Sequence, residues 1–267
     1  YEERLARAAE ATGAAGLDAL LIGVGADLRY LTGYAAMPLE RLTLLVVPAS
    51  GPPFLVAPRL ELGAAQAGVR PSLDIRTWDE TDDPYALALA GVAPGAAVPG
   101  AARFAVSDTM LAMHVLRLQS RAGPSAAFQL ASPVLRDLRM VKDPDEIALL
   151  RLAAQAADRV VAQIASGRLV GRTEADVARE VRERLIAEGH EEAHFAIVGS
   201  GPNSASPHHE ASERVIEAGE PIVLDIGGSL SGYGSDITRT LWVTGGDPDR
   251  GPDETFRHLF AVLHAAQ

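Results

Sequence analysis

A helix start near the middle of the chain constrains its fold more than any other feature, because the sequence patterns before and after it differ. Asp143 is a favourable N-cap residue, Pro144 suits the first helical position, and Glu146 is placed to bond back to the cap. Apolar residues then recur at spacings of three and four: Ile147, Leu150, Ala154, Ala157, Val161 and Ile164. This stripe predicts a long amphipathic helix. We therefore expect two domains, over residues 1–138 and 139–267.

The first domain alternates between helical and strand patterns. An Ala-rich helical pattern over 1–15 is followed by an apolar run at 19–24, which predicts a buried strand. Two further apolar runs flank a Gly-Pro-Pro turn within 42–57, as in a strand–turn–strand unit. Short strand patterns return at 74–78 and 103–106, with helical stretches between them. This alternation predicts an α/β domain.

The second domain combines helices with consecutive strands. Thr173 is a good N-cap for a second helix that runs to Glu188, and Gly189 suits its end. The apolar period then changes from that of a helix to that of strands, which we expect at 193–198, 215–216, 222–225 and 236–243. A helical pattern resumes from Gly251. The order of elements predicts an α+β domain.

Charge and composition exclude several classes of function. The 24 basic and 35 acidic residues give a net charge of −11, which argues against a surface for nucleic acid or for an anionic membrane. No apolar run reaches the length of a membrane span. The absence of cysteine excludes a disulfide scaffold, a thiolate metal site and a cysteine nucleophile, and it fits a cytoplasmic protein.

Two aspartates around a glycine-rich link are candidate metal ligands. Asp225 ends one apolar strand pattern, Asp236 opens the next, and the glycines between them suit a hairpin. If the two residues face each other, their Cβ atoms lie within about 5.5 Å, and the carboxylates repel unless a cation separates them. Oxygen ligands favour ions such as Mn²⁺, Mg²⁺ or Co²⁺. The alternative is structural: Asp225 caps a strand end and Asp236 pairs with Arg239.

Motifs on both sides of these aspartates form a distinctive set. A Pro-His element at 207–208 precedes them, Asp225 stands in Leu-Asp-Ile-Gly-Gly, and Asp236 stands in Ser-Asp-Ile-Thr-Arg-Thr. The set resembles that of the pita-bread metallopeptidases, in the branch of the Xaa-Pro aminopeptidases and prolidases. Upstream, 138–147 resembles the start of the family's catalytic domain and 27–33 resembles its creatinase-type N-terminal domain. The resemblance implies a creatinase-like α/β domain followed by an α+β pita-bread domain.

The resemblance also implies roles for individual residues. Asp225 would hold one metal ion, Asp236 would bridge two, and His208 would face the scissile bond, polarising its carbonyl or binding the tetrahedral intermediate. The implied cofactor is a pair of divalent ions, with manganese favoured over cobalt or zinc. His209 follows His208 on an extended segment, so its side chain should point the other way, as a surface or packing histidine.

Three more metal ligands are implied by the resemblance, one His and two Glu, in motifs that these 267 residues do not contain. We therefore expect a C-terminal portion beyond Gln267, and we expect the present residues alone to be inactive. His258 and His264 lie six residues apart on a predicted helix, which does not place them on one face, and we interpret them as surface residues.

The function predicted by these features is metal-dependent hydrolysis of the peptide bond between an N-terminal residue and proline. The partner would be a proline-containing peptide or dipeptide, and the protein would be a cytoplasmic homodimer. Two alternatives stay open. The fold serves some relatives as a metal-free module that binds peptides or proteins. Creatinase-like C–N hydrolysis uses the fold without metal, although the retained Asp225 and Asp236 argue against it.

Overall fold

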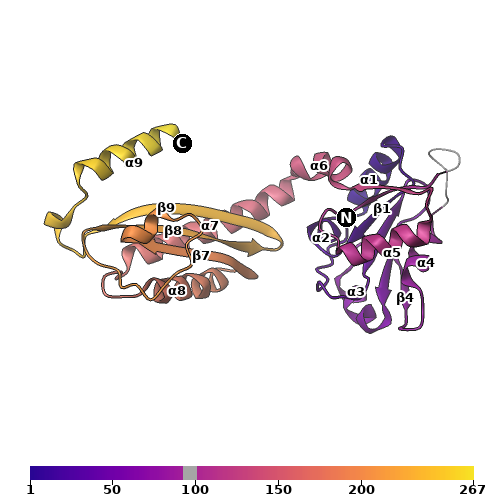
Figure 1. The fold of residues 1–267 in the computed structure, drawn as a ribbon, viewed down its shortest axis with the longest axis horizontal. Coiled ribbons are helices and arrows are strands. Elements are labelled where there is room, and N and C mark those ends of the chain that lie inside the picture. The colour runs from indigo at the N-terminus through magenta and orange to yellow at the C-terminus, as the bar shows by residue number, and fades with distance from the viewer. Residues whose placement is uncertain (93–100) are drawn as a thin grey trace. The chain divides into compact units, whose positions relative to one another are not determined.

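The computed structural model describes residues 1–92 and 101–267 and divides into two compact units (Figure 1). Unit 1 comprises Tyr1–Lys142 and unit 2 comprises Asp143–Gln267. The predicted domain boundary after residue 138 falls within the last helix of unit 1, shortly before this division. In the described parts of the chain, no helix is both long enough and apolar enough to span a membrane.

Unit 1 is built on one mixed sheet. Its described strands are β1 (Ala19–Gly23), β2 (Leu44–Pro48), β3 (Phe54–Pro58), β4 (Asp74–Trp78), β5 (Arg103–Val106) and β6 (Ala127–Leu130). Their order in the sheet is β4-β3-β2-β1-β5-β6. The first strand pairs antiparallel with β2 and parallel with β5, while β2 and β3 form the antiparallel pair predicted around the Gly-Pro-Pro turn. The α/β class predicted for this part of the chain is confirmed.

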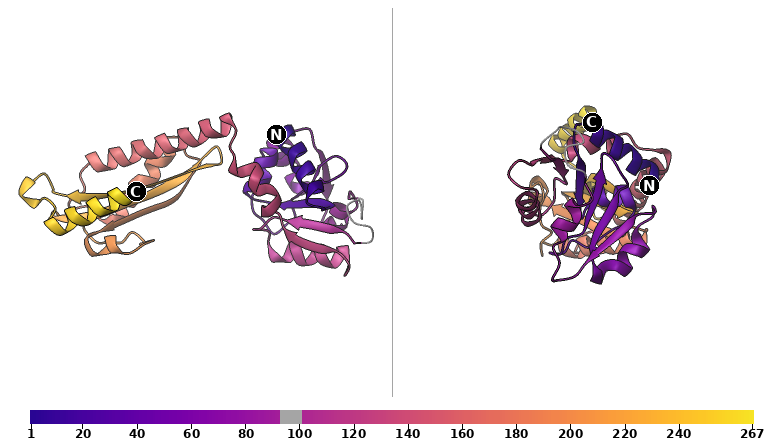
Figure 2. Two further views of the ribbon diagram at one scale, coloured as in Figure 1. Left: turned by 90° about the horizontal axis from the view of Figure 1, so that it is seen from above. Right: turned by 90° about the vertical axis from the view of Figure 1, so that its right-hand side faces the viewer.

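Helices cover both faces of this sheet (Figure 2). They are α1 (Glu2–Ala14), α2 (Ala26–Thr32), α3 (Leu62–Gly68), α4 (Pro84–Leu89), α5 (Ala112–Ala122) and α6 (Ser132–Met140), with a 3-10 turn η1 (Arg59–Glu61). Successive residues of β1 enter different cores. Leu20 and Ile22 pack with residues of α1, α2 and α6, whereas Leu21 packs with residues of α4 and α5. Burial on both faces explains why this strand reads as a continuous apolar run.

Unit 2 contains an antiparallel sheet of β7, β8 and β9 with helices α7 and α8 packed on one face (Figure 1). Its elements are α7 (Pro144–Ser166), α8 (Glu174–Ala187), β7 (Glu192–Ser200), η2 (Gly201–Ala205), β8 (Glu220–Leu230), β9 (Tyr233–Val243), η3 (Pro248–Arg250) and α9 (Glu254–Ala266). Ile222, Leu224 and Ile226 of β8 are buried in the core with residues of α7 and α8. The alternate residues of β8 therefore point to the opposite side, which we call the open face.

The predicted start of α7 is confirmed, but two residues of its predicted apolar stripe, Ile147 and Ala154, are exposed. Asp143 Oδ1 accepts a hydrogen bond from the Glu146 amide at 2.8 Å, and Glu146 Oε2 accepts one from the Asp143 amide at 3.0 Å. The buried members of the stripe lie in its second half: Ala157, Val161 and Ile164. In the first half, Ile147 is 44% exposed and Ala154 is exposed, while Ala153 is buried instead. A pattern of apolar residues does not reveal which of several neighbouring positions on a helix is buried.

Most other predicted elements of unit 2 are present with shifted ends. Thr173 caps α8 by accepting a hydrogen bond from the Asp176 amide, as predicted. The predicted strand at 215–216 is wrong, because Val215 makes only an isolated bridge with Thr173. A single bridged pair of residues does not make the repeated hydrogen bonds that define a strand. The predicted C-terminal helix forms as α9, whose large apolar side chains are exposed in the described structure: Leu259, Phe260, Val262 and Leu263.

Candidate functional site

Asp225 and Asp236 both lie on the open face of the sheet, on neighbouring strands and displaced by two residues along them. Asp225 is opposite Thr238, and Asp236 is opposite Gly227. The two aspartates are therefore diagonal neighbours, a relationship that typically separates residues by about 7–8 Å. The directly opposed arrangement considered from the sequence is not observed, because the hairpin turns at Ser231 and Gly232. Both residues have the positive φ that a two-residue type I′ turn requires, 51° and 83°.

Each aspartate has little internal compensation for its charge. Asp225 is half-buried and its Oδ1 accepts a hydrogen bond from the Thr238 hydroxyl at 2.7 Å. Asp236 is exposed, and no hydrogen bond or ion pair reaches its side chain within the described residues. Two acidic side chains therefore share one sheet face with a single neutral donor between them.

The structural alternative for this pair is wrong. Arg239 lies on the helix-covered face, where its Nη2 is 3.8 Å from Oδ1 of Asp158 in α7, so it does not pair with Asp236. Asp225 lies inside β8 and does not cap a strand end. Successive residues of a strand point to opposite faces. Asp236 and Arg239 are three residues apart, so their side chains lie on opposite faces of the sheet.

A glycine beside the two aspartates allows close packing on the open face. Gly227 is paired with Phe195 of β7 and with Asp236 of β9. A Cβ atom at Gly227 would collide with the Phe195 ring and with the Ser235 carbonyl oxygen. The first glycine of the Leu-Asp-Ile-Gly-Gly motif is therefore required because any side chain there would collide with Phe195 and Ser235.

A buried histidine supports β9 from the helix-covered face. His190 is 3% exposed, its Nδ1 lies 3.2 Å from the Leu185 carbonyl oxygen, and its Nε2 lies 2.8 Å from the Ser235 hydroxyl. Since a carbonyl oxygen only accepts, Nδ1 carries the proton and Nε2 accepts from Ser235. Burial lowers the pKa of His190, which favours this neutral form. The contact holds the side chain of Ser235, the residue directly before Asp236, and no sequence pattern pointed to it.

His208 lies apart from the aspartates, in the loop that follows η2. Its side chain is exposed and its φ is 55°, in the left-handed region that residues with a Cβ rarely occupy. The polar contact of Asp225 is with Thr238 and not with this histidine. Of the three predicted site residues, the structure thus brings two onto one face and presents the third on a neighbouring loop.

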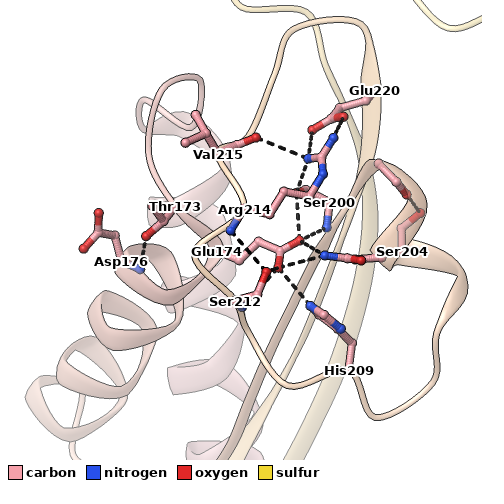
Figure 3. A network of polar contacts seen from close by, with 12 residues as sticks. Thr173, Glu174, Asp176, Ser200, Ser204, His209, Ser212, Arg214, Val215 and Glu220 are labelled. Carbon is pink, nitrogen blue, oxygen red and sulfur yellow. Dashed lines mark hydrogen bonds and ion pairs between the residues drawn. The ribbon is translucent and has the colours of Figure 1, made fainter.

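His209 belongs to a network around a carboxylate that no sequence pattern had singled out (Figure 3). Glu174, the first residue of α8, is fully buried. Its donors come from the loop between β7 and β8. They are the amide and hydroxyl of Ser200 at 2.7 and 2.8 Å, Asn203 Nδ2 at 3.1 Å, His209 Nε2 at 2.8 Å, and the hydroxyl and amide of Ser212 at 2.7 and 3.1 Å. Of the two predicted settings for His209, packing agrees with the structure and surface does not, since its side chain is 16% exposed and bonds Glu174.

These donors keep Glu174 ionised although its side chain is buried. Burial raises the pKa of Glu174, but the hydrogen bonds from Ser212, Ser200 and His209 outweigh it and lower the pKa to about 2. Arg214 adds positive charge nearby, since its Nη1 donates to the Ser200 hydroxyl at 2.7 Å while its guanidinium pairs with Glu220 at 2.6 Å. The network is saturated and offers no open coordination position.

The donor chemistry of Asp225 and Asp236 fits part of a divalent-metal site. Both side chains offer carboxylate oxygens on one face of the sheet, and Asp236 has no competing partner among the described residues. The described parts of the chain contain no group of three or more His, Asp or Glu side chains that could hold a metal ion. A metal bound here would therefore need ligands beyond these two to complete its coordination shell.

Two family models match the chain, one over each unit. The model described as Creatinase/Prolidase N-terminal domain matches residues 4–141, and the model described as Metallopeptidase family M24 matches residues 148–267. Together they confirm the fold predicted from the sequence, a creatinase-like α/β domain followed by a pita-bread domain. Asp225, Asp236 and His208 all lie in the second match.

Curated relatives and solved structures agree with these matches. The chain is 46% identical to the probable dipeptidase PepE of Mycobacterium tuberculosis, over 100% of this chain and 69% of the relative. It is 27% identical to the Xaa-Pro dipeptidase of Pyrococcus horikoshii, over 94% and 65%. Dipeptidase PepE from Mycobacterium ulcerans superposes with a TM-score of 0.83 at 44% identity, over 98% and 68%. Prolidase from Thermococcus sibiricus superposes with a TM-score of 0.87 at 29% identity, over 100% and 70%.

Proposed function

Because the chain belongs to metallopeptidase family M24, we propose that it hydrolyses the peptide bond between an N-terminal residue and proline in a metal-dependent reaction. The observation that carries this proposal is the pair Asp225 and Asp236. Two carboxylates share the open face of the sheet, with one neutral donor between them and no cation of the described chain beside them. Solvent screens the repulsion between the half-buried Asp225 and the exposed Asp236, so the pair costs little by itself and becomes favourable when a divalent ion is bound.

Asp225 and Asp236 are the residues of this chain that would hold the metal. A bound pair of divalent ions supplies Lewis acidity and a water nucleophile of lowered pKa. Asp225 keeps its free oxygen available because Thr238 occupies only Oδ1. Asp236 keeps both oxygens available, which suits a ligand that serves two ions. His190, through Ser235, holds the strand from which Asp236 projects.

His208 is the residue we assign to the reacting carbonyl. Its imidazole is exposed on the loop and can donate a hydrogen bond to the carbonyl oxygen of the substrate, where negative charge develops during attack. The donor is worth more in the transition state than with bound substrate, so its loss should lower kcat more than it changes KM.

We further propose that the substrate carries proline directly after its N-terminal residue. This preference is supported by the relatives whose names carry that specificity, the Xaa-Pro dipeptidase of Pyrococcus horikoshii and the prolidase of Thermococcus sibiricus. The relative with 46% identity is named only as a probable dipeptidase. The test must therefore offer dipeptides with and without proline.

The decisive experiment is an assay of the full-length protein with Mn²⁺ on Xaa-Pro dipeptides, matched dipeptides that lack proline, and longer peptides with proline second. We expect release of the N-terminal residue from the Xaa-Pro substrates and loss of activity with a chelator. Asp225→Asn and Asp236→Asn should each lower activity more than about 100-fold, since even the partners of metal ligands are worth 10- to 100-fold. Asp158→Asn, on the helix-covered face, is the matched control and should retain activity.

Other results would change the proposal in defined ways. Hydrolysis of dipeptides regardless of proline would leave a general dipeptidase. Absence of hydrolysis with every peptide, together with metal-independent peptide binding that survives Asp225→Asn, would indicate a binding module instead.

We also propose that manganese is the native ion and that the protein acts as a homodimer. Titration of metal-free protein with Mn²⁺, Co²⁺ and Zn²⁺ compares the ions directly. Light scattering of the full-length protein measures the assembly, and a monomer would contradict the second expectation.

A further inference from the structure

The loop between β7 and β8 is held by a buried carboxylate that the hydrolytic reaction does not itself use. We propose that Glu174 and His209 form a positioning pair that orients His208 toward the substrate carbonyl. The inference rests on the proposed function and deepens it, because it adds two residues to the same site. Neither residue touches substrate, so both act through His208.

The contacts of Glu174 are spread over residues 200–212. Ser200 stands at the end of β7, Asn203 lies in η2, His209 lies in residues 207–210, which we call the arm, and Ser212 follows the arm (Figure 3). A single carboxylate therefore joins the end of β7, η2 and both the arm and the residue that follows it. Because α8 packs on the sheet, its first residue gives the loop a rigid anchor.

The arm that carries His208 depends on one of these contacts. Within residues 207–210, the bond from His209 Nε2 to Glu174 Oε2 at 2.8 Å is the one polar contact of the described structure. The base of the loop is held a second time, since Arg214 bonds both the Ser200 hydroxyl and Glu220. Removal of the His209 imidazole should therefore release the arm and leave the base in place.

The backbone at His208 shows why such an anchor matters. Its φ of 55° is a conformation that a residue with a Cβ adopts only when its surroundings hold it. Pro207 restricts the chain on one side, and the bonded His209 restricts it on the other. Adjacent histidines thus have separate tasks: His209 faces inward to the anchor, and His208 faces outward.

The kinetic test compares His209→Ala, His209→Gln, His208→Ala and the double variant His208→Ala/His209→Ala in the full-length protein with Mn²⁺. We expect His209→Ala to lower kcat about 10- to 100-fold, the range for a lost hydrogen bond to a charged group, with little change in KM. His209→Gln can still donate to Glu174 and should recover most of the rate. In the His208→Ala background, His209→Ala should have no further effect.

Losses that multiply in the double variant, or an unchanged kcat in His209→Ala, would overturn the proposal. His194→Ala serves as the control, since that histidine is exposed on β7 and should leave every readout unchanged.

A second readout is independent of activity. Limited digestion with a Glu-specific endoproteinase should cleave after Glu210 at least about 10-fold faster in His209→Ala than in wild type, with cleavage in unit 1 unchanged. His209→Gln should restore slow cleavage. If wild type hydrolyses no peptide, the proposed function fails, while unchanged cleavage after Glu210 in His209→Ala still overturns the positioning pair.

Discussion

The buried Glu174 and the open-face pair Asp225 and Asp236 stand in opposite electrostatic settings within one unit. Glu174 is fully buried and accepts hydrogen bonds from Ser200, Asn203, His209 and Ser212, whereas Asp225 has one donor and Asp236 has none among the described residues. The more deeply buried acid is the better compensated one. The less buried pair keeps carboxylate oxygens that no donor of the described residues occupies.

The difference supports our proposal that Glu174 serves the fold and that Asp225 and Asp236 serve as metal ligands. A carboxylate whose donors all come from the chain stabilises that arrangement and cannot bind a cation without losing them. A pair of carboxylates without such donors adds little to stability and gains from a cation. If burial were the only criterion, the fully buried Glu174 would have been chosen as the functional acid in place of Asp225 and Asp236.

The largest effect expected from breaking this comparison is on stability. Glu174→Ala leaves the donors of Ser200, Ser212 and His209 buried without an acceptor, so the free energy of unfolding should fall by about 3–5 kcal/mol, as when one partner of a buried charged pair is removed. Urea unfolding measures it. Glu183→Ala, on the exposed side of the same helix, should change stability by less than about 0.5 kcal/mol. A loss below about 1 kcal/mol for Glu174→Ala would mean that water replaces the carboxylate.

Acid should remove nearly as much stability through the same residue. The pKa of Glu174 is about 2 in the folded protein against an ordinary value of 4.5, a difference equivalent to about 3 kcal/mol. Because the folded-state value is the lower one, this stability is complete above pH 4.5 and is lost as the pH falls through about 2. The stability gap between wild type and Glu174→Gln should therefore shrink on acidification. A gap that does not depend on pH would contradict the assignment.

A smaller effect is expected where the open face is packed rather than charged. Gly227→Ala places a methyl group against the Phe195 ring and the Ser235 carbonyl oxygen, and overpacking of this kind costs about 1–3 kcal/mol. Gly234→Ala is the matched control in the same hairpin, since its Cβ would meet nothing closer than 4.0 Å. Equal losses of unfolding free energy in both variants would show that backbone freedom, and not the Phe195 contact, sets the cost.

The smallest effect on the metal-free protein should come from the open-face acids. Asp236→Asn removes a charge with no internal partner, so in a chelator its free energy of unfolding should stay within about 0.5 kcal/mol of wild type. Addition of Mn²⁺ should then raise the melting temperature of wild type but not of the variant, because only a protein that binds the ion is stabilised by it. A large loss in the chelator would move Asp236 into the structural group.

Much of the fold could be predicted because it depends on neighbouring residues. The capping box of Asp143 and Glu146 spans four residues, and the β2–β3 pair follows from its turn. Prediction failed where packing over long distances decided, as in the first half of α7, where Ala153 and not Ile147 is buried. The site divides in the same way. The motifs around His208, Asp225 and Asp236 predict these residues as site residues, whereas Glu174 and His190 carry no local signal for their burial.

For the acidic pair, the sequence by itself determined the face, and the tertiary structure determined the geometry. If a two-residue hairpin turn moves by one residue along the chain, the pairing of the two strands shifts by two residues. A shift of two residues leaves every side chain on its own face, so Asp225 and Asp236 stay on the same side of the sheet. The turn at Ser231 and Gly232 then makes them diagonal. The donors of Glu174 come from residues 26 to 38 positions away along the chain. Only the folded loop could bring them together, because no local pattern records which distant groups will share a buried space.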